Sequence, residues 1–166
     1  MRLRDQTAEI FQMMEVPFPN MLPPFRVPQA ADPLASEPAA LCQDWMIQDL
    51  ERSGIPLAAA EALGWRAVPD GYAIPFHDPQ TGAPLLCPNG SPFEHKRLRF
   101  PSPDCKYLSP KGSGVHPFIT GPVHDYLTAN PAAALVVTEG EKKALRATLA
   151  GIPTVGISGI DCWGEG

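Results

Sequence analysis

The residues best suited to chemistry lie near the carboxyl end of the sequence, where an apolar segment gives way to a charged one. The segment "AALVVTEG" ends on Glu139 and Gly140, and Lys142 and Lys143 follow. Ligands of open α/β sheets bind beyond the carboxyl ends of the strands, and glycine lets the backbone turn closely there. A carboxylate at such a place could bind a hard cation such as Mg²⁺ or act as a general acid or base. Glu139 could equally cap the helix that follows.

A second group of candidate residues is basic. Residues 94–111 contain five Lys or Arg side chains against two acidic ones, in a chain whose net charge is −5. Contact with nucleic-acid phosphate would explain this local excess, because such contacts come mainly from Lys and Arg. Taken alone, the pattern favours the simpler interpretation of a solvated basic loop. The acidic total argues against a protein that coats nucleic acid or anionic lipid.

The elements that must position Glu139 form a strand–helix–strand pattern. The apolar run before Glu139 is typical of a parallel strand buried on both faces. The segment "EKKALRATLAG" predicts a helix that ends at Gly151, and "PTVGISG" predicts a second strand. Together they predict one βαβ unit.

The middle of the chain predicts a helical pair and a hairpin. Residues 41–54 and 56–64 have helical spacing, with Pro56 suited to a first turn and Gly64 to a C-terminal cap. A DNA-binding helix-turn-helix is one interpretation, but two helices packed beside a sheet are favoured because neither carries a basic face. Alternation from Tyr72 to Phe76 and the turn sequence "DPQTG" predict a hairpin. The segment "HKRLRFP" predicts a strand with a basic face, and residues 102–122 a loop with Lys106, Tyr107 and Lys111 exposed.

The composition of the chain predicts a proline-rich arm and the cellular location. The 166 residues include 21 prolines, and seven of these fall in residues 16–40, which predicts an extended, mobile arm after a short amphipathic helix in residues 1–15. The four cysteines are widely separated and indicate reduced thiols in a cytosolic protein. No signal peptide and no run of ~18 apolar residues is visible, so we expect a cytoplasmic protein without a membrane span.

The βαβ segment resembles a known family. "VVTEGEKKALRATLAGIPTVGISG" is similar to the start of a Toprim domain, the catalytic α/β module of bacterial-type DNA primases, type IA and type II topoisomerases and related nucleases. Glu139 and Gly140 match the Glu-Gly of that pattern, Gly151 its helix-terminal glycine and Gly159 the glycine after the second strand. More narrowly, the segment looks like the Toprim-like domain of primases from phages, plasmids and integrated elements.

The upstream segment extends the resemblance to residues 45–163. Bacterial primases carry a basic region before the Toprim domain, with a Lys-Tyr-Leu core followed by Ser-Pro. Here "CKYLSPKG" supplies Lys106, Tyr107 and Leu108, and Arg97 or Arg99 matches an upstream arginine. With the resemblance, phosphate contact becomes the favoured interpretation of the basic segment.

The resemblance implies an α/β fold in three parts. These are an amphipathic segment and proline-rich arm (1–40), a small mixed α+β basic subdomain that binds nucleic acid (41–131), and the start of a Toprim-like domain (132–166). It implies the N-terminal part of a mobile-element primase, with single-stranded DNA and nucleotides as partners, a fused or separate helicase, and Mg²⁺-dependent nucleotidyl transfer in DNA replication. Glu139 would be the metal ligand or the acid/base. The phosphate contacts would be Arg97, Arg99, Lys106, Tyr107, Lys111 and Lys142.

Two departures from the family pattern limit this expectation. A complete Toprim domain has a later strand with Asp-x-Asp, and the single Asp161 does not match it. The zinc ribbon of many primases is also missing, and the spacing of Cys87, His95 and Cys105 fits no common zinc module. We therefore expect a piece of a longer or truncated protein, inactive by itself. The second interpretation is a non-catalytic module that binds nucleic acid or a helicase, and the third is a Toprim nuclease, for which an ATPase domain is lacking.

Overall fold

The described part of the chain contains helices and strands in two groups. The computed structural model describes residues 22, 37–102, 105–112 and 114–158 of the 166. The first group is α2 (Glu37–Glu51), α3 (Leu57–Ala62), β1 (Arg66–Val68), β2 (Gly71–Pro75), β3 (Glu94–Ser102) and β4 (Cys105–Leu108). The second group is α4 (Gly121–Ala129), β5 (Val136–Glu139), α5 (Glu141–Leu149) and β6 (Thr154–Ile157). The fold is therefore mixed α/β.

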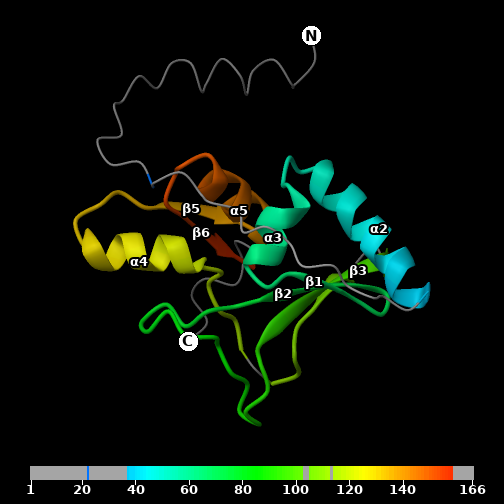
Figure 1. Ribbon diagram of the computed structural model, residues 1–166. Helices are drawn as coiled ribbons and strands as arrows, with labels where there is room; N and C mark the ends of the chain where they lie inside the picture. Colours follow the sequence, from blue (N-terminus) through cyan, green and yellow to red (C-terminus); the bar gives the residue numbers. More distant parts are fainter. Residues whose placement is uncertain (1–21, 23–36, 103–104, 113, 159–166) are drawn as a thin grey trace.

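The first group forms an antiparallel sheet in the order β1-β2-β3-β4. Helix α2 packs against β1 and β2, so the favoured interpretation of two helices beside a sheet is confirmed (Figure 1). Central strand β2 is buried from Gly71 to Ile74 because it has a strand on each side and α2 across it. β2 pairs with β1 and with β3. The predicted "DPQTG" turn lies between β2 and β3 in sequence and closes a small loop through the bridge between His77 and Pro84.

The second group contains the predicted strand–helix–strand unit. Strands β5 and β6 pair in parallel, with Glu139 opposite Ile157, and α5 connects them. The buried residues of α5 are Glu141, Ala144, Leu145 and Thr148, a spacing that places them on one stripe of the helix. Ala144 and Leu145 pack in the same core as Trp65 and Tyr72, so the main core contains residues from both groups.

The prediction that the strand before Glu139 is buried on both faces is wrong. Leu135, Val136 and Val137 are exposed, Val137 to 50%. Among the described residues only β6 pairs with β5, so its other edge is open. No second strand covers this edge of β5 in the described part of the chain, so its apolar side chains stay exposed.

Other expectations about local structure were also wrong. Helix α2 begins at Glu37, inside the segment assigned to the proline-rich arm. Leu22 of that arm is buried against Ile119 and Val123, and its amide donates to the carbonyl of Gly151 at 3.1 Å. The predicted helix in residues 1–15 lies outside the described residues, as do Gly159, Asp161 and Trp163.

The segment predicted as a loop, residues 102–122, contains β4 and the first residues of α4. Thr120 begins α4 by accepting a hydrogen bond from the amide of Val123, and Pro122 lies in its first turn. Tyr107 in β4 is half-buried rather than exposed, while Lys106 and Lys111 are exposed as predicted. None of the helices that the structure describes is long and apolar enough to cross a membrane.

Gly71 is where β2 approaches β3 most closely. A Cβ at this position would overlap the carbonyl oxygen of Arg97. We expect Gly71→Ala to lower the free energy of unfolding by about 2 kcal/mol, because the two strands must separate. Urea denaturation would measure it, with Gly121→Ala as the control, since a Cβ there meets nothing within 4 Å. Equal stability of the two variants would contradict the close approach.

Candidate metal and nucleic-acid site

Glu139 lies at the carboxyl end of β5 with its side chain in solvent. Gly140 follows with φ +83° and begins α5, a backbone conformation that favours glycine. In β6, a Cβ at Gly156 would lie 3.0 Å from the carbonyl oxygen of Gly140, so a glycine there lets the strand pass beneath the turn. The Glu139 side chain is 56% exposed, and its Oε2 lies 3.9 Å from Nζ of Lys143. The carboxylate is thus open to solvent, and its role as a metal ligand or acid/base stays a prediction.

The strongest polar cluster of the described residues surrounds Asp49 in α2. Its carboxylate is only 5% exposed, and Oδ2 accepts hydrogen bonds from the Tyr72 hydroxyl and from Lys142 Nζ, both at 2.9 Å. Arg97 Nε lies 3.8 Å from the same oxygen, and Arg52 Nη2 lies 3.3 Å from Oδ1. One carboxylate therefore faces three cations, and the cluster keeps a positive excess.

The surroundings of Asp49 keep it ionised. Burial by itself would raise the pKa of Asp49, but the hydrogen bonds from Lys142 and Tyr72 and the charges of Lys142 and Arg97 outweigh it and hold that pKa below its ordinary value. The same burial, together with the Asp49 carboxylate, raises the pKa of Tyr72. Tyr72 therefore stays a hydrogen-bond donor at neutral pH.

Arg97 and Tyr107 lie side by side on neighbouring strands. The Arg97 guanidinium lies over the Tyr107 ring, 4.9 Å from its centroid, and Nη1 donates to the carbonyl oxygen of Lys106 at 3.3 Å. Burial, with the Glu141 carboxylate adding to it, raises the pKa of Tyr107 to about 12. Both side chains are held in place by the sheet and carry donors at neutral pH.

A buried pair links the sheet to α5. His95 Nδ1 lies 2.7 Å from Glu141 Oε1, and both side chains are almost fully buried. The contact is a hydrogen bond between the imidazole ring and the carboxyl group. Glu141 is thereby engaged inside the protein and is not available beside Glu139.

The structure brings some of the predicted site residues together and not others. Arg97, Tyr107 and Lys142 meet around Asp49, while Glu139 lies one helical turn from Lys143. Arg99 lies over the ring of Phe100, at 5.0 Å from the centroid. No contact between the exposed Lys106 or Lys111 side chain and this cluster is found among the described residues. Their roles as phosphate contacts stay predictions.

Sequence reasoning missed Asp49 and Glu141, and it did not predict which side chains pair with them. A signal was present, because Asp49 falls between Met46 and Leu50 on the buried stripe of α2, and Glu141 falls on the stripe of α5. A carboxylate on an apolar stripe must find a partner when it is buried. The identity of those partners could not be found from spacing, since they come mainly from other elements: β2, β3 and α5.

The fit to a metal ion is partial. Within the part of the chain that the structure describes, no group of three or more His, Cys, Asp or Glu side chains is placed to hold one. Glu139 offers one exposed carboxylate, and Mg²⁺ is commonly bound by one or two carboxylates together with waters and substrate phosphates. Glu139 by itself therefore does not make a complete protein site for the ion among the described residues.

Comparison with protein families, with curated proteins and with solved structures finds no match to this chain.

Proposed function

We propose that this chain is part of a Toprim primase-like protein of a mobile element, which binds single-stranded DNA and takes part in Mg²⁺-dependent nucleotidyl transfer during DNA replication. The proposal is carried by one observation: an exposed carboxylate, Glu139, ends a parallel strand, and the helix that follows supplies Lys142 to a cationic cluster with Arg97. Ligands of α/β sheets bind at this end of the strands. A cytoplasmic location and a helicase partner belong to the same proposal.

In this proposal the residues have distinct roles. Glu139 would hold the ion or accept a proton from the attacking hydroxyl. A bound Mg²⁺ would neutralise charge on the phosphates during transfer. Arg97 and Lys142 would orient a phosphate, because Asp49 neutralises only part of the charge around it, and Tyr107 would donate a hydrogen bond. The open edge of β5 offers a place for a further strand.

A primer-synthesis assay tests the proposal directly. The longest product of the reading frame is incubated with single-stranded template, nucleoside triphosphates and Mg²⁺, and new oligonucleotides are resolved on a gel. We expect synthesis that needs the metal. If template binds and nothing is made under any metal condition, the nucleotidyl-transfer proposal fails.

The alternative is a module that binds nucleic acid or a helicase without catalysis. It is favoured by the poor fit to a metal ion, since the described residues contain no group of three or more His, Cys, Asp or Glu side chains placed to hold one. The two proposals share the DNA contacts and differ in the assay above. Tight binding without synthesis would support the module.

The exposed lysines of the basic segment provide a test of DNA binding. We expect the double variant Lys106→Gln/Lys111→Gln to reduce the slope of log affinity against log salt by about 1.4, because each lost phosphate contact removes about 0.7 for a single strand. Fluorescence anisotropy with an oligothymidylate at several salt concentrations would measure it. Arg97 is left unchanged, since its contact with buried Asp49 makes it part of the fold.

The control is Arg66→Gln. Arg66 is exposed on β1, and its ion pair with Glu94 does not involve Asp49. Surface ion pairs contribute little to stability, so the control variant should fold. A reduction in slope per removed cation that is as large in Arg66→Gln as in the double variant would move the phosphate contacts away from Lys106 and Lys111.

A further inference from the structure

A cavity lies along α5, facing the turn that follows α2. Its volume is ≈ 610 Å³, within the range of about 300–1,000 Å³ of clefts that enclose a small ligand or a few side chains. Its lining is basic and apolar, and it consists of Ser53, Lys142, Lys143, Arg146, Ala147, Ala150 and Ile152. None of these described lining residues is acidic, so the cavity lacks counter-charges of its own.

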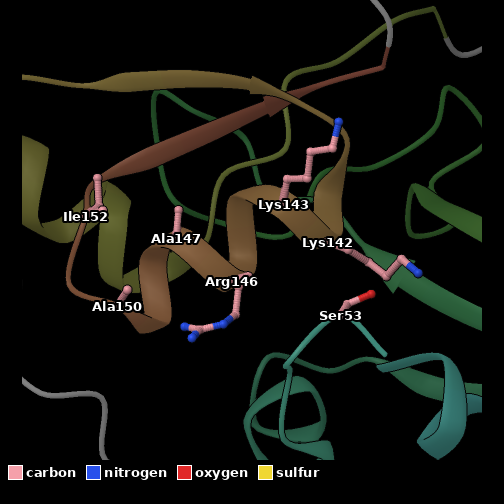
Figure 2. A pocket seen from close by; sticks show the side chains of 7 residues that line it. All are labelled: Ser53, Lys142, Lys143, Arg146, Ala147, Ala150 and Ile152. Carbon is pink, nitrogen blue, oxygen red and sulfur yellow. The ribbon is translucent and has the colours of Figure 1, made fainter. Parts of the chain in front are cut away.

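The basic side chains of the lining do not converge on one point. Figure 2 shows the Lys143 and Arg146 side chains leaving α5 on opposite sides. Lys142 Nζ is bound to Asp49, and Lys143 Nζ lies 3.9 Å from Oε2 of Glu139. Arg146 makes no ion pair with any residue that the structure describes. The cavity therefore suits an extended, largely apolar occupant with single carboxylates rather than a compact polyanion.

One residue of the proline-rich arm lies at the end of this cavity. The amide of Leu22 donates to the carbonyl of Gly151 at 3.1 Å, and Gly151 lies between Ala150 and Ile152 of the lining. The Leu22 side chain is 8% exposed and packs beside α4. Backbone and side chain together therefore anchor the arm next to the cavity.

The segment that immediately precedes Leu22 complements the lining. Residues 9–21, "EIFQMMEVPFPNM", contain two glutamates, no basic residue and seven apolar side chains apart from the prolines. The predicted helix in residues 1–15 would place Ile10, Phe11 and Met14 on one face. Residues 23–36 have no such complementarity, because their one basic and one acidic side chain cancel.

The length of the chain permits this contact. Glu15 precedes Leu22 by seven residues, which extend over at most about 23 Å at ~3.3 Å per residue. Pro17 and Pro19 favour an extended backbone between them. Arg146 precedes Gly151 by five residues, about 8 Å along a helix at ~1.5 Å per residue. The Glu15 carboxylate can therefore reach the Arg146 guanidinium while Leu22 stays anchored.

We propose that residues 9–21 of the same chain occupy this cavity, with the Glu15 carboxylate on Arg146 and apolar side chains on Ala147, Ala150 and Ile152. The segment then covers α5 on the side away from its buried stripe. Glu139 does not line the cavity, so the proposal does not depend on the proposed function.

Amide hydrogen exchange of the full chain, read by mass spectrometry on peptides from residues 9–21, tests the proposal. We expect these amides to exchange at least about tenfold more slowly than in a free peptide of the same sequence. Arg146→Gln should speed their exchange about two- to fivefold, the effect of losing one surface ion pair. Ala150→Glu should remove most of the protection, because its carboxylate repels Glu15. Exchange at the free-peptide rate in the unchanged chain would overturn the proposal.

Two controls place the protection at this cavity. Arg146 and Ala150 are exposed, so both variants should fold. Arg66→Gln also removes an exposed arginine, but Arg66 lies on β1 outside the lining. Val137→Lys tests the exposed apolar edge of β5 as the other place where the segment could dock. We expect full protection in both controls, and protection lost in Val137→Lys but kept in Ala150→Glu would overturn the proposal.

Exchange of the two charges tests the pairing itself. Glu15→Arg should speed exchange at least as much as Arg146→Gln, and Glu15→Arg/Arg146→Glu should restore protection toward that of the unchanged chain. A double variant no better protected than Glu15→Arg would overturn the pairing. Protection should also be independent of protein concentration, since the contact lies within one chain. Protection that falls on dilution would assign the segment to a second copy and overturn the proposal.

Discussion

Replacing Glu139 by glutamine is expected to abolish Mg²⁺-dependent primer synthesis while leaving the fold intact. The substitution keeps the shape of the side chain and removes the charge that binds a cation or accepts a proton. A positioned acid or base typically contributes 10²–10⁴-fold to a rate, so a loss of about 10³-fold is expected. The fold should tolerate the change, because the side chain is 56% exposed and its nearest cation, Lys143, lies 3.9 Å away.

The matched control is Glu61→Gln on α3, another exposed glutamate with a single surface partner, Gln43. Both variants would be assayed for primer synthesis with Mg²⁺ on the longest in-frame product, beside thermal denaturation. Full activity in Glu139→Gln would remove Glu139 from the mechanism. A similar loss in Glu61→Gln would show that the assay reports general damage and would contradict a specific role.

Local patterns were enough to predict the βαβ unit. The apolar run before Glu139, the charged helix and Gly151 at its end each specify local structure. The observed bounds of β5, α5 and β6 lie close to those that these segments predict. Helix α4 was missed although Thr120 and Pro122 are a recognisable start signal, because the glycines and prolines around it were read as a loop.

Burial could not be predicted from the same patterns. The sequence around Val136 and Val137 predicts a buried strand. The exposure of these two side chains depends on whether a second strand covers the open edge of β5. In β3, Arg97 turns toward Asp49, while Phe100 is 77% exposed after a register shift in the pairing with β4. Tertiary contacts decided which face of each strand is covered, and no single segment contains that information.

The candidate site was also predicted only in part. Glu139 was predicted as a site residue from its place at the end of a strand. The structure has that strand end, and the chemical role of Glu139 stays a prediction. Lys142 was predicted as a phosphate contact from sequence position, yet its Nζ is bound to Asp49, 93 residues earlier in the chain. The pairing that organises the cationic cluster is therefore a property of the packing between α2, β3 and α5.

That pairing leads to the second large effect, which is expected in Asp49→Asn. Removing the carboxylate leaves Lys142 and Arg97 close together without their shared counter-charge, and the Tyr72 hydroxyl without its ionised acceptor. Breaking a buried ion pair on one side usually costs about 3–5 kcal/mol, and the partial exposure of Lys142 places this case near the lower end. Urea denaturation at pH 7 would measure the loss, with the exposed Asp44→Asn on the same helix as the control.

The loss in Asp49→Asn should depend on pH in one direction. The pKa of Asp49 in the folded protein lies below its unfolded value of about 3.9, so its stabilising contribution is complete above that pH and is lost as the pH falls through the folded pKa. The stability difference between the unchanged chain and Asp49→Asn should thus be constant from pH 7 to pH 5 and shrink toward pH 3. A difference that grows on acidification, or one no larger than that of Asp44→Asn at pH 7, would mean that the Asp49 carboxylate does not hold this cluster together.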